Sequence, residues 1–164
     1  MKTDKDIFEI MANHLLNQKE KSMTKGETCA YRGYTLDQIS EVEDLFKGEE
    51  SYYDDYDFQQ ALINKFGKPK MMCGVGCLIK DKYYQSDIEN MVAEHQSVLK
   101  AIMLSNPDWE INDSGIKLMK SIQDIHDNYY VEEWEEFLEK LSKDFDEHGN
   151  FYSKNFLEIA EAIL

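Results

Sequence analysis

Three cysteines are the first residues of this chain whose chemistry depends on their spacing. Cys73 and Cys77 are separated by three residues in "MMCGVGCLI", and Cys29 lies upstream in "TCAYRG". Structural zinc sites use four ligands, usually in two closely spaced pairs. Only one pair is present here, so a fourth ligand would have to be one of four histidines: His14, His95, His126 or His148. We predict that the cysteines line a core as small apolar side chains, with a metal site or a reactive thiol as the alternatives.

The two glycines between Cys73 and Cys77 resemble the start of a phosphate-binding loop. Gly74 and Gly76 lack the downstream Gly-Lys-Ser/Thr or third glycine of such loops, and no helix opens directly after them. We therefore predict that they allow the backbone of a hairpin to pack closely against its neighbours.

A second set of residues follows the order His…His-Asp…Asp. His95 precedes the adjacent pair His126 and Asp127, and Asp144 or Asp146 could supply a last carboxylate. This is the ligand order of HD-type metal-dependent phosphohydrolases, so such an enzyme is one hypothesis, with His95, His126 and Asp127 as its metal ligands. A histidine on an apolar helix face is more often a core residue, and we prefer that interpretation for His95.

Arg32 stands out as a functional candidate in a strongly acidic chain. Its planar guanidinium suits a carboxylate or a phosphate, and nearby tyrosine rings offer faces on which a ligand can stack. The alternative is a structural ion pair with an acidic side chain. We predict that the ligand-binding residues are Arg32, Tyr31, Tyr34, Tyr83 and Tyr84.

Composition and charge limit the classes of protein to consider. The chain has 164 residues, 42% of them apolar, with ten Tyr and eight Phe, which argues against disorder. The first residues carry charges instead of the apolar run of a signal peptide, and no apolar run has the length of a membrane span. We expect a soluble, intracellular protein with reduced cysteines and no cofactor.

The net charge of −15 argues against two kinds of partner. A strongly acidic surface repels nucleic acid phosphates and anionic membranes, so we expect neither to bind directly. The acidity either keeps the protein soluble or mimics nucleic acid in the basic groove of another protein.

Apolar periodicity predicts the elements that must position these residues. Cys29–Gly33 and Met71–Ile79 read as two short strands that pair as a hairpin. The remaining chain reads as helices: Asp4–Lys21, Asp37–Phe46, Tyr56–Phe66, Ser86–Met103, Ile116–Tyr129, Val131–Phe145 and Ser153–Leu164. The predicted fold class is α+β and predominantly helical, a compact single domain over 1–164 with about five to seven helices and one small two-stranded β-hairpin.

Several short motifs together resemble a family of small uncharacterised proteins of tailed bacteriophages and prophages. That family carries a Cys-x-Tyr-Arg-Gly element, a Cys-(Ala/Gly)-(Val/Ile)-Gly-x-Leu-Ile run followed by an Asp and a Tyr, an Ile-Gln-x-Ile-His-Asp helix and then a Trp. The corresponding residues here are Cys29–Gly33, Cys73–Ile79 with Asp81 and Tyr84, Ile122–Asp127, and Trp134. In the family a short turn separates the two cysteine elements, so residues 34–70, which are acidic, rich in tyrosine and partly helical, are interpreted as an insertion.

The resemblance implies a phage protein that works in the cytoplasm of the infected host cell. We expect an accessory protein, a binding protein more than an enzyme, that counters defence or aids host takeover. It would sequester a small nucleotide-like signal or bind a host protein, with a homo-oligomer left open. The alternatives are the HD-like phosphohydrolase and an acidic nucleic-acid mimic that uses the stretch Glu41–Asp57 and the face Glu132–Glu139.

Overall fold

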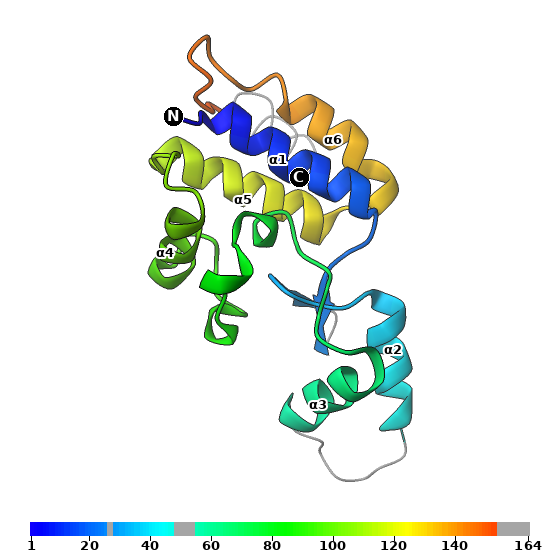
Figure 1. The fold of residues 1–164 in the computed structure, drawn as a ribbon. Coiled ribbons are helices and arrows are strands. Elements are labelled where there is room, and N and C mark those ends of the chain that lie inside the picture. Colours follow the sequence, from blue (N-terminus) through cyan, green and yellow to red (C-terminus); the bar gives the residue numbers. More distant parts are fainter. Residues whose placement is uncertain (26–27, 48–54, 154–164) are drawn as a thin grey trace.

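The computed structural model describes residues 1–25, 28–47 and 55–153. Over these residues the chain forms six α-helices, several short 3₁₀ turns and one two-stranded antiparallel sheet (Figure 1). The prediction of a predominantly helical α+β fold is therefore confirmed. The predicted helix Ser153–Leu164 and part of the acidic stretch Glu41–Asp57 lie outside the described residues.

The main core is built where helix α1 (Asp4–Gln18) packs against α5 (Asp113–Asn128) and α6 (Trp134–Leu141). These three helices lie side by side at one end of the molecule (Figure 1). Each helix has one apolar face, and α5 buries four apolar side chains from it: Leu118, Met119, Ile122 and Ile125. Burial of such a face, more than intrinsic propensity, stabilises helices of this length.

Two polar residues mark where α1 and α5 begin. Thr3 caps α1, since its hydroxyl accepts the N–H of Asp6 while the Asp6 carboxylate accepts the N–H of Thr3. Asn112 caps α5 by accepting the N–H groups of Ser114 and Gly115. These caps define where α1 and α5 begin.

Residues of the proposed insertion form a second, smaller core. Helix α2 (Leu36–Leu45) packs against α3 (Asp55–Phe66), and the two lie away from α1 and α6 (Figure 1). The buried members of this core are Met23, Tyr34, Ile39, Val42, Phe58 and Leu62. Five of these six fall within 34–70, so this segment carries apolar contacts of its own.

The predicted hairpin between Cys29–Gly33 and Met71–Ile79 is wrong. Strand β1 (Met23–Thr24) instead pairs with β2 (Thr28–Cys29), and the contact between the two predicted strands is reduced to one bridge, Gly33 with Met71. The second segment turns back on itself because the Cys73 sulfur accepts the N–H of Gly76 and the Cys77 thiol donates to the carbonyl of Gly74. Residues Gly76–Leu78 then form the 3₁₀ turn η2.

The predicted role of the glycines in close packing is confirmed. A Cβ atom on Gly76 would lie 2.4 Å from the carbonyl oxygen of Tyr31, and one on Gly74 would lie 2.4 Å from the side chain of Ile122. Both contacts are far below van der Waals distance. A side chain at either position would push the turn away from the rest of the core.

The predicted helix Ser86–Met103 is also wrong over its first half. Ser86–Ile88 is a 3₁₀ turn, η4, and helix α4 covers only Gln96–Ser105. The predicted helix Val131–Phe145 likewise divides into the 3₁₀ turn η5 (Val131–Glu133) and α6. Within the described residues, no helix combines the length and the apolar character needed to cross a bilayer.

Candidate functional site

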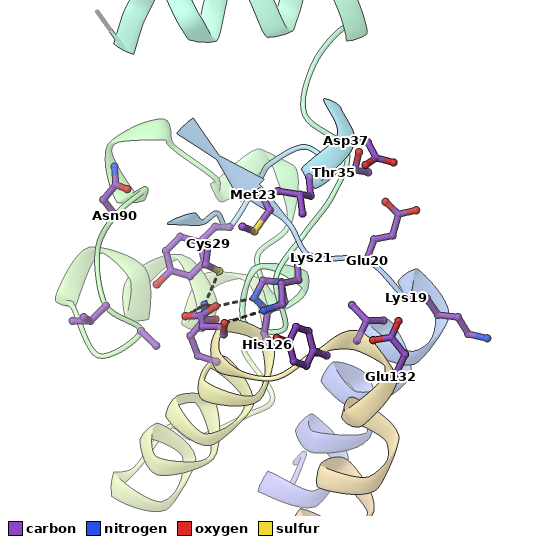
Figure 2. A pocket seen from close by; sticks show the side chains of 18 of the residues that line it. Lys19, Glu20, Lys21, Met23, Cys29, Thr35, Asp37, Asn90, His126 and Glu132 are labelled. Atoms are coloured by element: carbon purple, nitrogen blue, oxygen red, sulfur yellow. Dashed lines mark hydrogen bonds and ion pairs between the residues drawn. The ribbon is translucent and has the colours of Figure 1, made fainter. Parts of the chain in front are cut away.

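A cleft of about 1030 Å³ opens between four segments of the chain. Its walls are the end of α1 with the two-stranded sheet of β1 and β2, the start of α2, residues 90–93, and the C-terminal end of α5 with residues 130–132. Figure 2 shows the side chains that reach it, with His126 and Cys29 pointing toward each other at its base. Residues more than 100 positions apart in sequence thus meet in one cavity.

His126 is fully buried, and its hydrogen bonds define its tautomer. Its Nε2 atom accepts the backbone N–H of Ser22 at 3.1 Å, and its Nδ1 atom lies 2.8 Å from the carboxylate of Asp127. A backbone N–H can only donate, so Nε2 carries no proton and Nδ1–H donates to Asp127. The ring also stacks on Trp134, with centroids 5.5 Å apart. His126 therefore positions Asp127 and has no free nitrogen with which to take up a proton.

Asp127 presents an ionised carboxylate to the cleft. Burial raises the pKa of this carboxyl, but the hydrogen bond and the electrostatic attraction of the His126 N–H, followed by hydrogen bonds from Cys29 and Gln123, outweigh burial and hold the pKa below its ordinary value of 3.8. The side-chain amide of Gln123 donates to both carboxylate oxygens, at 3.1 and 3.2 Å. The carboxylate is thus held in one orientation while its side chain stays 36% exposed.

Cys29 lies beside this carboxylate as a protonated thiol. A hydrogen bond with Cys73 and burial both raise its pKa, and the negative charge of Asp127 raises it further. Its sulfur accepts the amide of Gln123 at 2.7 Å. Burial and the neighbouring Cys73 also raise the pKa of Cys77 to about 12. All three cysteines are free and belong to the main core or pack against it, as predicted. The raised pKa values of Cys29 and Cys77 argue against a reactive thiolate at these two positions.

The geometry does not favour a metal centre at this place. Atoms of Cys29, His126 and Asp127 that could ligate a metal lie within 4.8 Å of one another. To bind a cation through Nδ1, however, His126 would need its proton on Nε2, where the N–H of Ser22 already points. Three ligands with a histidine in the wrong tautomer make a poor site.

The residues predicted for an HD-type phosphohydrolase do not come together in the described part of the chain. The interpretation of His95 as a core residue is wrong, because His95 is exposed and caps α4, its ring accepting the N–H of Ser97. Asp146 binds the backbone of a loop through the N–H groups of His148 and Asn150. Neither His95 nor Asp146 joins the group that His126 and Asp127 form with Cys29, and Asp144 does not join it either.

Arg32 faces the interior, away from the cleft. Its guanidinium donates to the backbone carbonyls of Tyr31, Gly76 and Ile79, and its side chain is 7% exposed. It also pairs with Asp81 and lies 5.1 Å from the ring centroid of Tyr84. These contacts use the donors with which Arg32 would otherwise grip a ligand.

The four tyrosines predicted to accompany Arg32 do not surround a common cavity. Tyr31 alone among the predicted set lines the cleft, and its hydroxyl donates to the carbonyl of Met91 at 2.6 Å. Tyr34 belongs to the second core and donates to the carbonyl of Gly67. Tyr83 lies under the ammonium of Lys82, and Tyr84 donates its hydroxyl to Glu89.

Glu89 holds part of the cleft in place, a role that sequence reasoning missed. Its carboxylate accepts the N–H groups of Tyr31 and Arg32, both at 2.9 Å, as well as the hydroxyl of Tyr84. It thereby anchors the wall segment 90–93, which starts with Asn90 at a positive φ of 65°. The motif "IQDIHD" was the available signal for Gln123 and Asp127, but no pattern in the sequence pointed to the contacts of Glu89 with Tyr31 and Arg32.

Comparisons with known proteins reveal no relative of this chain. No protein-family model matches the chain, and the searches of curated proteins and of solved structures give no match either. The function must therefore be argued from the cleft itself.

Proposed function

We propose that this chain is a phage accessory protein that binds a host protein in the cleft and so acts in counter-defence or host takeover. One observation supports the binding role most strongly: three apolar side chains that line the cleft are largely exposed. Leu36 is 46% exposed, Val92 62% and Tyr130 77%. Grouped apolar side chains with polar neighbours are typical of surfaces that bind another protein.

The charges of the cleft favour a protein over a nucleotide-like signal. Four carboxylates line it, from Glu20, Asp37, Asp127 and Glu132, against the two ammonium groups of Lys19 and Lys21. A phosphate needs cationic donors, and the sole arginine of the chain is engaged elsewhere. A nucleotide would meet repulsion where a basic protein segment would be attracted.

The same residues argue for binding without catalysis. Both nitrogens of His126 are engaged, and the thiol of Cys29 is kept protonated. Nucleophilic catalysis needs an activated nucleophile within reach of a base that can accept its proton. Neither group is available in this arrangement.

The acidic helix α6 supports the alternative of a nucleic-acid mimic less well. Its face is partly neutralised, because Lys140 pairs with Glu136 within the helix and Lys143, just after its end, pairs with Glu139. The other stretch assigned to that role, Glu41–Asp57, is described only in part. The cleft is the more complete site.

Affinity capture from a host-cell lysate with three versions of the chain tests the proposal. Val92→Glu places a charge on the apolar lining, and Met103→Glu makes the same change on α4, outside the cleft, where Met103 is 55% exposed. We expect the wild type and Met103→Glu to retain the same host protein and Val92→Glu to lose it. Equal capture by both variants would contradict a role for the cleft.

A thermal-shift panel of nucleotides and cyclic nucleotides separates the two kinds of ligand. We expect none of these compounds to raise the Tm of the wild type. A compound that raised the Tm of the wild type and of Met103→Glu, but not of Val92→Glu, would replace the protein partner by a small signal.

A further inference from the structure

We infer that the group recognised at the base of the cleft is a guanidinium, an arginine side chain of the partner, held by the carboxylate of Asp127 at the C-terminal end of α5. This inference rests on the proposed function, since it names the chemistry of the partner that the cleft would bind.

The end of α5 already attracts a cation. A helix C-terminus carries a partial negative charge, and α5 has 16 residues whose peptide dipoles add to it. The ammonium of Lys21 donates to the carbonyl of Asp127 at 2.9 Å. The chain therefore places one of its own positive charges at this end, next to the carboxylate that faces the cleft.

The Asp127 carboxylate is arranged to receive a second cation. Its oxygens accept Nδ1–H of His126 at 2.8 Å and the amide of Gln123 at 3.1 and 3.2 Å. Because His126 is neutral, these donors orient the carboxylate without cancelling its charge. A fixed carboxylate with an exposed edge matches the planar fork of a guanidinium, which donates two parallel hydrogen bonds.

A further acceptor beside Asp127 lacks a donor. The Oε1 atom of Gln123 is buried and has no hydrogen-bond partner, although the Nε2 atom of the same amide is fully engaged. Turning the amide over would place its oxygen against the Asp127 carboxylate, so the present orientation is the favourable one. Buried acceptors without partners are uncommon, and a shift of the Gln123 side chain toward the cleft on binding would let this one accept a donor.

The walls suit the rest of an arginine side chain. Tyr130 offers an exposed ring, and Val92 offers an exposed apolar side chain for the methylene stem. A guanidinium stacks on aromatic faces and is less strongly hydrated than an ammonium, so it loses less on entering a partly buried cleft. These features favour arginine over lysine.

Titration of the ¹⁵N-labelled full chain with short peptides tests the inference. The probes are acetylated, amidated Gly-Leu-X-Leu-Gly peptides in which X is arginine, citrulline or lysine; citrulline keeps the shape and loses the charge. We expect the arginine peptide to shift the amide signals of Gln123, Asp127 and Tyr130. The citrulline peptide should bind at least about tenfold more weakly, because the loss of one hydrogen bond to a charged group weakens binding by at least that factor.

Two matched variants make the assignment specific. Asp127→Asn removes the charge but keeps an oxygen that can accept Nδ1–H of His126, so the fold is retained. Asp124→Asn makes the same change on α5 at a residue outside the cleft. We expect Asp127→Asn to abolish the preference for arginine over citrulline, and Asp124→Asn to leave it unchanged.

The outcomes separate this inference from the proposed function. Equal binding of the arginine and citrulline peptides, equal binding of arginine and lysine, or no shift at the three amides would overturn the guanidinium site. If Asp127→Asn still retains the host protein that Val92→Glu loses, the binding function stands and the guanidinium site fails. If neither variant affects capture, the binding function fails as well.

Discussion

Arg32 and Asp127 are both charged residues of short motifs, yet the fold uses them in opposite ways. The guanidinium of Arg32 donates to three backbone carbonyls, and its side chain is almost fully buried. The carboxylate of Asp127 is oriented by His126 and Gln123 but still faces the cleft. A charged side chain whose hydrogen bonds all stay inside the chain serves the architecture, whereas one that is oriented and still exposed can serve recognition.

The largest expected effect comes from removing the buried guanidinium. Arg32→Met leaves the carbonyls of Gly76 and Ile79 without this donor, and we expect a loss of about 3 kcal/mol in the free energy of unfolding. Urea denaturation followed by circular dichroism measures it. Arg32→Lys is the matched control and should recover only part, because an ammonium cannot reach the same carbonyls together.

The same variant also distinguishes a structural role of Arg32 from a ligand-binding role. If Arg32→Met left stability unchanged but weakened capture of the host protein, Arg32 would be a ligand-binding residue after all.

A smaller effect is expected at Glu89, which connects the Arg32 region to the cleft. In Glu89→Gln one of the two acceptor oxygens becomes an amide N–H₂, which faces the N–H of either Tyr31 or Arg32 because each of these binds a different oxygen of Glu89. We expect a loss of about 2 kcal/mol in unfolding free energy, with faster hydrogen exchange at residues 90–93. Glu94→Gln, which removes an exposed pair with Lys120, should cost less than about 1 kcal/mol. Unchanged hydrogen exchange at residues 90–93 would show that Glu89 does not anchor this wall of the cleft.

These regions show what the sequence could and could not predict. Helices α1 and α5 were predictable because each buries one continuous apolar face. The run Met71–Ile79 alternates like a strand, but hydrogen bonds between its thiols and its own backbone bend it into a turn. Within Ser86–Met103 the apolar spacing of a helix continues past Glu89. No helix forms there, and the carboxylate of Glu89 binds the backbone N–H of Tyr31 in a distant segment instead. Local patterns cannot register such a contact.

The candidate site was predictable only in part for the same reason. The pair His126 and Asp127 was singled out from its order in the sequence, with an incorrect partner, His95. Its actual neighbour, Cys29, is brought to it by the pairing of β1 with β2 and by a contact with Gln123. A site assembled from segments about 100 residues apart depends on tertiary packing, which periodicity does not specify.

The pH dependence of stability tests whether Asp127 carries its charge. The pKa of this carboxyl is lowered by folding, so its contribution to stability is present above the ordinary value of 3.8 and is lost as the pH falls through the folded value. The excess stability of the wild type over Asp127→Asn should therefore shrink as unfolding is measured from about pH 6 to about pH 3. Asp124→Asn serves as the control. An excess that stayed constant would mean that folding leaves the pKa of Asp127 unchanged, and an excess that grew on acidification would mean that Asp127 is protonated in the folded protein.

The smallest expected effect concerns Cys29, the thiol next to that carboxylate. Its raised pKa keeps it protonated at pH 8, so iodoacetamide should label it at least about tenfold more slowly in the folded chain than in urea. Peptide mapping by mass spectrometry distinguishes it from Cys73 and Cys77. Asp127→Asn removes one of the negative charges that raise the pKa of Cys29 and should speed its labelling slightly. The stability of this variant at neutral pH should change only by the contribution of the lost carboxylate. Labelling of the folded wild type as fast as the unfolded chain would instead reveal a thiolate in the cleft, and the binding role assigned to Asp127 would give way to thiol chemistry.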